Sequence, residues 1–261
     1  MSFISHLIIR TQFIAVFKSN KIYIGLSQFS ENYLDVKPIF VLDTKNNKSS
    51  ENMKTKEKIL QAALELFNQS GATIVTTNDI AKDLKMSPGN LYFHFKNKEQ
   101  IIREIFKKFS AETTLIWKPQ TKLARTKMNF NIINLVDKNL ELYWKYRFFH
   151  RELYILRKKD PELSKLWHNH LKKMSLLMII LYKHWVKAGH FLPIATREEM
   201  ESIGELLFVA SNSFMLFFET KDRGLQPQQK TFEKARRHLL RMLRPYVTGQ
   251  SRAEIEIFFN S

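Results

Sequence analysis

The chain of 261 residues contains no cysteine, and only seven glycines and seven prolines. Without cysteine it can form no disulfide, no thiolate nucleophile and no zinc site with cysteine ligands, which suits a reducing cytoplasm. Its longest purely apolar run, Leu176–Tyr182, falls well short of the roughly 20 residues that a membrane-spanning helix needs. We therefore expect a cytoplasmic protein without a membrane segment, and the few helix breakers favour an all-α fold.

Signatures of enzymes are also missing. The sequence has no glycine-rich phosphate loop, no G-x-S-x-G and no H-E-x-x-H. His150, His170 and His184 do not stand at a metal-ligand spacing, so each is expected to line a pocket or the surface. We expect a protein that is not an enzyme and that needs no cofactor or metal.

Acidic residues are too few to balance the basic ones, and the formal net charge is +17. Lys and Arg exceed Asp and Glu by two in residues 1–52, by two in residues 53–99 and by thirteen in residues 100–261. A basic chain is attracted to phosphate backbones. Since most of the excess lies in residues 100–261, two interpretations stay open: a generally lysine-rich protein, or a C-terminal region that binds an anionic ligand or extends a DNA contact.

What is present most clearly is a helix-turn-helix in residues 76–98, TTNDIAKDLKMSPGNLYFHFKNK. Thr76 with Asp79 three residues later has the form of a capping box. Ser87 is positioned to cap a second helix, in which Pro88 takes the first position and needs no N–H partner. Such a pair of helices typically places the second helix in the major groove of DNA.

From about Thr55 to Ile105 the chain closely resembles the TetR/AcrR family of bacterial transcriptional repressors. The resemblance rests on the helix KEKILQAALELFNQSG, on "T-T-x-x-I-A" from Thr76, and on "L-Y-x-H-F-x-x-K" from Leu91. It implies an all-α protein with two parts. A three-helix DNA-binding domain, the head, would comprise residues 53–100, and a helical domain for ligand binding and dimerisation, the body, would comprise residues 101–261.

The resemblance also implies which head residues contact DNA. Asn90 carries an amide that can read adenine, and Gly89 permits close approach. Tyr92 and His94 match the phosphate contacts of the family, although a core position for Tyr92 and a solvated position for His94 are alternatives. Lys98 stands at a helix N-terminus, where a phosphate is favoured. The complete set is Thr77, Asn78, Pro88, Gly89, Asn90, Tyr92, Phe93, His94 and Lys98.

Residues 1–52 differ in character from the rest of the chain. HLIIRTQFIAVF and KIYIGLS have weak strand character, and a polar stretch leads to Met53, where a TetR-like sequence begins. We expect translation to start at Met53, so that residues 1–52 are a poorly ordered or mis-annotated extension. The alternative is a genuine extension that packs on the head or forms a small strand unit.

Apolar periodicity predicts the remaining helices. Pro119 is expected to end the fourth helix, and Asp160-Pro161 is expected to begin the longest one. The predicted ranges are 54–69, 98–117, 127–146, 148–159, 161–188, 197–220, 231–247 and 252–259. The stretch Tyr146–Leu153, YRFFHREL, resembles a recurring segment of TetR-like bodies without indicating a ligand.

Aromatic and methionine side chains fall on the helices that enclose the inducer pocket in relatives. We expect the three tryptophans among them to lie near one cavity, and we expect a small apolar or amphipathic ligand, more readily anionic than cationic. Glu141, Glu152 and Glu205 are the acidic residues that could reverse this charge preference. The expected pocket residues are Tyr143, Trp144, Phe148, Phe149, Trp167, Met174, Met178, Tyr182, Trp185 and Phe208, and a packed core without a cavity is the alternative.

Because one head reads few base pairs, the resemblance implies a homodimer on a palindromic double-stranded DNA operator. The helices near 197–220 and 231–247 are expected to pair across the dimer, unless they only close the protomer core. The expected interface residues are Ile203, Leu206, Leu207, Ala210, Phe214, Leu239 and Met242. The resulting function is a ligand-responsive repressor. The alternative is a DNA-bound adaptor whose body docks a protein partner.

Overall fold

The computed structural model describes residues 12–18, 21–30, 33–43, 47–123, 130–194, 196–221 and 229–260. Contacts divide the chain into two units, Met1–Glu57 and Lys58–Ser261, and each is described by itself. Among the described residues, no helix combines the length and the apolar composition that crossing a bilayer requires.

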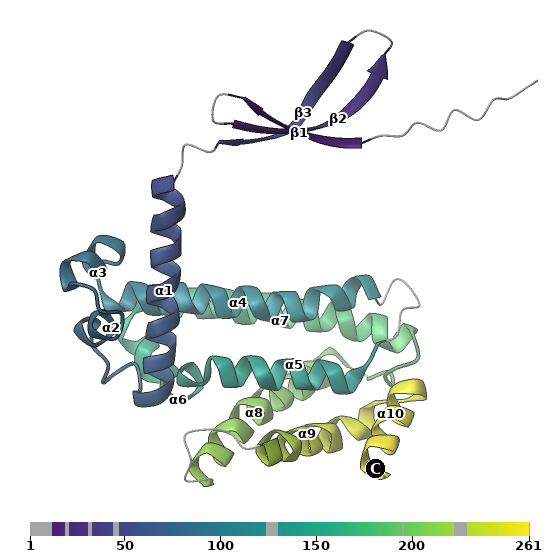
Figure 1. Ribbon diagram of the computed structural model, residues 1–261. Helices are drawn as coiled ribbons and strands as arrows, with labels where there is room; N and C mark the ends of the chain where they lie inside the picture. The colour runs from purple at the N-terminus through teal and green to yellow at the C-terminus, as the bar shows by residue number, and fades with distance from the viewer. Residues whose placement is uncertain are drawn as a thin grey trace, which may run out of the picture. The chain divides into compact units, whose positions relative to one another are not determined.

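The N-terminal unit contains an antiparallel sheet of three strands, β1 (Gln12–Lys18), β2 (Lys21–Ser30) and β3 (Tyr33–Asp43), in that order (Figure 1). These strands correspond to the small strand unit of the alternative, and the poor order of residues 1–52 stays a prediction. Each strand takes its partners from its neighbour in sequence, a pairing that single-strand periodicity does not reveal. The start of translation at Met53 stays a prediction.

The second unit is helical, and its described residues contain no strand, so the all-α prediction is confirmed for it. An isolated bridge joins Phe191 to Val247. The helices are α1 (Asn47–Ser70), α2 (Thr77–Asp83), α3 (Pro88–His94), α4 (Lys98–Leu123), α5 (Ile132–Lys145), α6 (Arg147–Lys159), α7 (Pro161–Lys187), α8 (Arg197–Lys221), α9 (Gln229–Leu243) and α10 (Gly249–Asn260).

Helix ends follow local chemistry where the sequence supplies it. Asp160 accepts hydrogen bonds from the N–H groups of Glu162 and Leu163 and so caps α7. Gly189, at a φ of +79°, follows the other end of α7. Several boundaries differ from the predictions, among them the starts of α5 at Ile132 and of α10 at Gly249. Helix α1 begins at Asn47, α4 continues past Pro119 to Leu123, and α9 gives way at Leu243 to the 3₁₀ turn Arg244–Tyr246.

Pro119 does not end α4 in the structure. A proline removes one hydrogen bond from a helix but does not forbid it, and α4 packs along α7 (Figure 1). At the end of α9, Pro245 has no N–H to continue the helix, and the chain tightens instead. Residues 127–129 of the predicted helix 127–146 lie outside the described residues.

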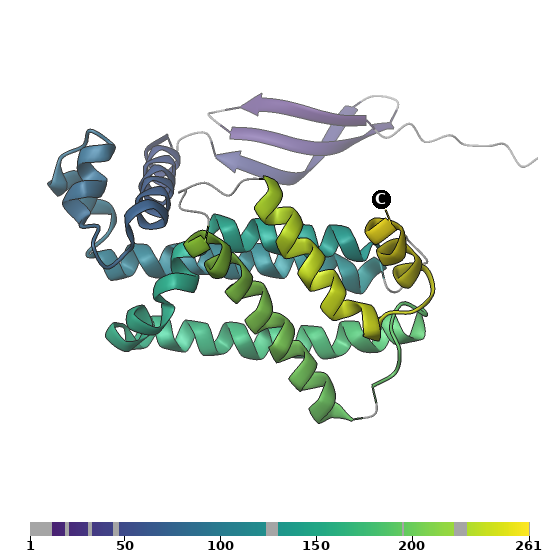
Figure 2. The same cartoon turned by 90° about the horizontal axis from the view of Figure 1, so that it is seen from below.

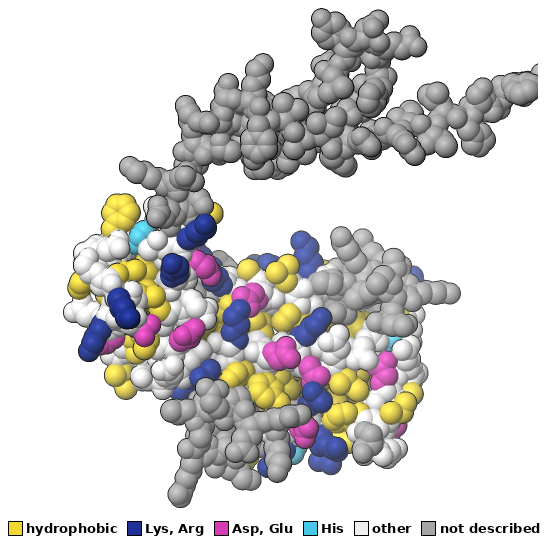
Figure 3. Space-filling model, in the orientation of Figure 1, with side chains coloured by type: hydrophobic (Ala, Val, Ile, Leu, Met, Phe, Trp, Pro, Cys, Tyr) yellow, Lys and Arg dark blue, Asp and Glu magenta, His cyan; other side chains and the backbone are white. Residues whose placement is uncertain are grey.

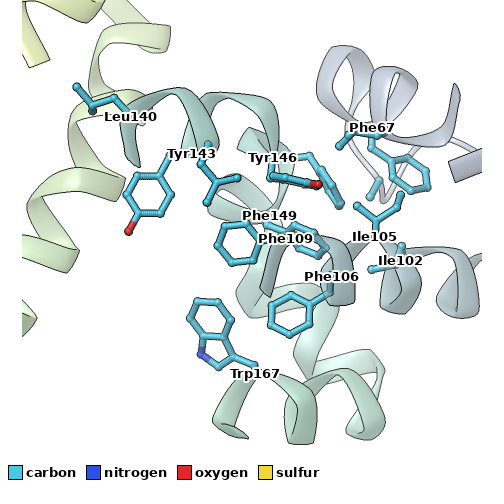
Figure 4. Close-up of a cluster of buried hydrophobic side chains, with 14 of the residues drawn as sticks. Phe67, Ile102, Ile105, Phe106, Phe109, Leu140, Tyr143, Tyr146, Phe149 and Trp167 are labelled. Carbon is cyan, nitrogen blue, oxygen red and sulfur yellow. The ribbon is translucent and has the colours of Figure 1, made fainter. Parts of the chain in front are cut away.

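Aromatic rings fill the centre of the second unit, where α4, α6 and α7 meet (Figure 4). Phe106 lies with its ring centroid 5.6 Å from that of Phe149, and Phe109 lies 5.4 Å from Tyr146. Phe67 of α1 reaches Phe148 at 5.3 Å, so the core is continuous between head and body. On another side, α9 packs against α5 and α8 (Figure 2).

Candidate functional site

The helix-turn-helix is fixed by the caps that the sequence predicts. The Thr76 hydroxyl accepts a hydrogen bond from the N–H of Asp79 at 3.2 Å, and the Asp79 carboxylate accepts one from the N–H of Thr76 at 2.8 Å. Hydrogen bonds from Thr76 lower the pKa of Asp79. Ser87 caps α3 by accepting from the N–H of Asn90, and Lys85 makes the turn at a φ of +53°. The predicted capping box and the cap of α3 are confirmed.

Helix α3 presents polar and aromatic side chains on one face and buries the other. Leu91 and Phe95 are buried, whereas Asn90 is exposed, Phe93 is 77% exposed and Tyr92 is 49% exposed. The alternative that Tyr92 is a core residue is therefore wrong. Its hydroxyl lies 2.9 Å from the Thr77 hydroxyl and joins α2 to α3.

The remaining head residues on the predicted list differ in exposure. Pro88, Gly89 and Asn78 are exposed, whereas Thr77 and His94 are half-buried. A Cβ at Gly89 would meet nothing within 4 Å, so the protein itself leaves room for a side chain there. The arrangement brings one surface of α2 and α3 together for binding, and each DNA contact stays a prediction.

Lys98 has partners within the protein. Its ammonium donates to the carbonyl oxygens of Ala72 at 2.6 Å and Val75 at 2.7 Å, with Thr73 at 3.4 Å. Partial burial lowers its pKa. The phosphate contact stays a prediction, but in the structure the principal contact of this ammonium is the turn between α1 and α2.

Other lysines of the head region are exposed to solvent. Figure 3 shows Lys and Arg side chains at the head end of the visible face, interspersed with acidic ones. Because exposed cations attract phosphates without reading bases, this pattern suits general affinity for DNA. The exposed lysines are Lys54, Lys56, Lys58, Lys82, Lys85 and Lys96.

The predicted pocket residues are distributed over several separate contacts. Trp167 packs 5.8 Å from Phe106 and 6.2 Å from Phe208, whereas Trp185 stacks on Phe191 at 5.2 Å. Both tryptophans lie on α7, 18 positions apart, which is about 27 Å along the axis. The expectation of one cavity shared by all three tryptophans is therefore wrong.

The rest of the predicted pocket follows the same division. Phe149 and Tyr143 belong to the central cluster, in which Tyr143 is buried and burial raises its pKa to about 12. Phe148 packs on the head through Phe67. Four others lie elsewhere. Tyr182 contacts Phe191, and Met174 and Met178 on α7 are half-buried. The guanidinium carbon of Arg147 lies 4.4 Å from the ring centroid of Trp144.

Two histidines in the central cluster were not expected to be core residues. His170 is buried, and its Nδ1 lies 2.8 Å from the hydroxyl of Ser110. The Nε2 atom of His150 is buried and has no hydrogen-bond partner among the described residues. Burial lowers the pKa of both imidazoles to about 4. Ser110 and His170 are 60 positions apart, so no local pattern could have paired them.

Helix α8 carries many apolar residues. Among those of its residues whose burial the structure describes, none is buried. Leu206, Val209 and Phe217 are each more than half exposed and recur on one face. Of the predicted interface residues, Ile203, Leu207, Ala210, Phe214 and Met242 are half-buried, whereas Leu239 is 4% exposed. Leu239 is already buried in the core of the protomer, so it is not available for the predicted dimer interface.

Two family models match this chain, each over a different range. The family model described as bacterial regulatory proteins, tetR family, matches residues 59–105, and that of a bacterial transcriptional repressor matches residues 125–255, half of the chain. The HTH-type transcriptional regulator QacR of Staphylococcus aureus is 32% identical over 124 residues, which cover 46% of this chain and 66% of that protein.

Two further relatives align with different fractions of the chain. The probable acrEF/envCD operon repressor of Escherichia coli is 35% identical over 57 residues, covering 22% of this chain and 26% of its own. These sequence matches thus span less than two thirds of the curated relatives. A TetR-family regulator from Marinobacter aquaeolei superposes with a TM-score of 0.66 at 27% identity, over 80% of this chain and 98% of its own. The chain belongs to the TetR family of bacterial transcriptional regulators.

Proposed function

We propose that the chain is a repressor that binds a palindromic operator as a homodimer and leaves it when a small ligand occupies the body. The observation that carries the DNA-binding part is the face of α3. A capped helix presents Asn90, Tyr92 and Phe93 to solvent instead of burying them. One relative is named as a probable operon repressor, which supports the direction of regulation. Binding to an operator also implies a place in the bacterial cytoplasm.

Exposed apolar residues of α8 support the homodimer. Three large apolar side chains on one helix, Leu206, Val209 and Phe217, stay exposed in the protomer, and a second copy of the same face would remove them from water. Two heads held at a fixed distance then select two half-sites at a fixed spacing.

The central aromatic cluster supports a ligand that is apolar or amphipathic rather than cationic. Glu141 and Glu205 are exposed, and the Glu152 carboxylate is engaged with the head. None of these three carboxylates is therefore available as the buried counter-charge that binding of a cationic ligand requires. The unpartnered Nε2 of His150 offers an acceptor to a ligand hydroxyl or amide.

Selection of bound fragments from bacterial genomic DNA tests this proposal. We expect a palindromic consensus protected as two half-sites, and a compound screen against that operator should find ligands that release it. Enrichment without any consensus would refute operator binding. The adaptor alternative would instead give a consensus, no releasing ligand, and a protein partner retained on the body.

A further inference from the structure

The segment Tyr146–Leu153 meets the end of α1 in the structure. The N–H of Phe148 donates to the side-chain oxygen of Asn68 at 3.1 Å. The amide nitrogen of Asn68 donates to the carbonyl of Lys145 at 2.8 Å, and Arg151 donates to the carbonyl of Asn68. Asn68 is buried, so these hydrogen bonds tie the last turn of α1 to the junction of α5 and α6.

Glu152 extends this joint to the turn after α1. One of its carboxylate oxygens accepts from the N–H of Ala72 and the other from the N–H of Thr73, both at 2.8 Å. Successive N–H groups that point the same way form a concave site for an anion, and here a body carboxylate fills it. Gly71, at a φ of +91°, allows this geometry, because a Cβ there would stand 2.7 Å from the Glu152 oxygen.

The same turn is held from its other side by α4. The Lys98 ammonium donates to the carbonyl oxygens of Ala72 and Val75, while the Glu152 carboxylate accepts from N–H groups of the same turn. Beside them lies a cavity of about 100 Å³, lined by Ala72, Thr73 and Lys98 from the head and by Leu156 and Leu163 from the body. The polar contacts of Glu152 and Lys98 therefore border this cavity, beside the apolar contact of Phe67 with Phe148.

Helix α6 also reaches the aromatic core. His150 lies 4.9 Å from the ring of Tyr143 and 6.2 Å from that of Phe109. Residues two apart on a helix point to different sides, so His150 and Glu152 face different surroundings. A displacement of α6 within the core would therefore be transmitted to the turn that Glu152 holds.

We propose that Glu152 is a positioning residue through which α6 sets the orientation of the DNA-binding head. Its two hydrogen bonds hold the turn between α1 and α2, and a ligand that shifts α6 releases the head by weakening them. This inference rests on the proposed function for its ligand step only, because the structural step concerns the protein without DNA or ligand.

The absence of cysteine makes the structural step measurable in the full-length chain. Asp83→Cys on α2 and Lys172→Cys on α7, both exposed, provide the only two sites for spin labels. Labelled protein diluted with unlabelled protein then reports the head-to-body distance by double electron-electron resonance. We expect one narrow distribution in the parent and about a doubling of its width with Glu152→Ala, since both hydrogen bonds are lost.

Two further variants make this comparison decisive. Glu141→Ala removes the same charge from an exposed position on α5 and should leave the distribution as in the parent. Glu152→Gln keeps the size of the side chain but offers a single acceptor oxygen, so it should give an intermediate width even if Glu152→Ala fails to fold. A Glu152→Gln distribution as narrow as that of the parent overturns the assignment.

The functional step uses the operator fragment recovered by selection. Glu152→Ala should weaken operator binding about tenfold, which corresponds to about 1.4 kcal/mol, and leave binding to random DNA unchanged, because a loosely held head must be ordered on a fixed half-site. Equal affinities for parent and variant would overturn this step. If selection finds no operator, the proposed function fails while the distance measurement still decides the joint.

Discussion

The α2–α3 pair and the core between α4 and α7 use aromatic side chains in opposite ways. Phe93 on α3 is 77% exposed, whereas Phe106 on α4 is 1% exposed and touches rings from α6 and α7. In the head, local caps fix the helices and leave the aromatic face for a partner. In the body, the aromatic rings pack against one another. A ligand that enters this cluster must therefore displace packed side chains.

Replacing the aromatic residue in each region gives the largest test of this difference. Phe106→Ala should lower the free energy of unfolding by about 3–5 kcal/mol, because it opens a cavity among Phe149, Trp167 and His170. Phe93→Ala should change it by at most about 0.5 kcal/mol and should weaken operator binding. Chemical denaturation measures both variants, and similar losses of stability would contradict the comparison.

Acid should weaken the body through His150 and His170 of the central aromatic cluster. The pKa of His150 and of His170 is about 4 in the folded protein, below the ordinary value of 6.5. The unfolded chain therefore binds more protons between these values. Their contribution is fully present above about pH 6.5 and is lost as the pH falls towards 4, by up to about 3 kcal/mol for each imidazole.

Urea denaturation across this pH range measures the loss. His150→Phe keeps an aromatic ring beside Phe109 and Tyr143 but cannot titrate, so it should remove about half of the pH dependence. Lys173 also lowers the pKa of His170, and Lys173→Met should reduce the remainder slightly. An unchanged pH profile in His150→Phe would show that His150 is accessible to protons in the folded state.

The same contrast explains what could be predicted from the sequence. Thr76 with Asp79 and Ser87 with Pro88 act within four residues, so a local pattern predicted α2, α3 and their caps. The reading face of α3 followed from helical spacing around Leu91 and Phe95. These elements depend on hydrogen bonds between neighbours in sequence, which a single chain displays directly.

Local sequence patterns could not predict contacts between positions that are distant in the chain. The hydrogen bonds of Glu152 to the turn after α1 join residues about 80 positions apart, and Glu152 was expected at most as a ligand-facing carboxylate. Periodicity placed Trp167 and Trp185 on the inward stripe of α7 but not their different ring partners. It also placed Leu239 on an apolar stripe without showing that α9 buries it within the protomer.

A smaller effect concerns base reading by the head. Asn90→Ala should weaken operator binding by about 1–3 kcal/mol and barely affect random DNA, because only a matched base offers partners to the amide. The main-chain cap from Ser87 is unaffected by this change, so α3 should stay folded. Fluorescence anisotropy at one fixed salt concentration compares the two DNAs. Equal losses on both would show that Asn90 does not read a base.

The smallest effect separates two glycines of the head. At Gly89 a methyl group meets nothing within 4 Å, and alanine favours a helix over glycine by up to about 1 kcal/mol. Gly89→Ala should therefore raise the melting temperature slightly, yet weaken operator binding if DNA approaches the backbone there. Gly71→Ala should lower the melting temperature, because Gly71 has a φ of +91° and a methyl group there would meet the Glu152 carboxylate. If Gly89→Ala binds the operator like the parent, this glycine does not serve close approach, and the reading face is confined to the side chains of α3.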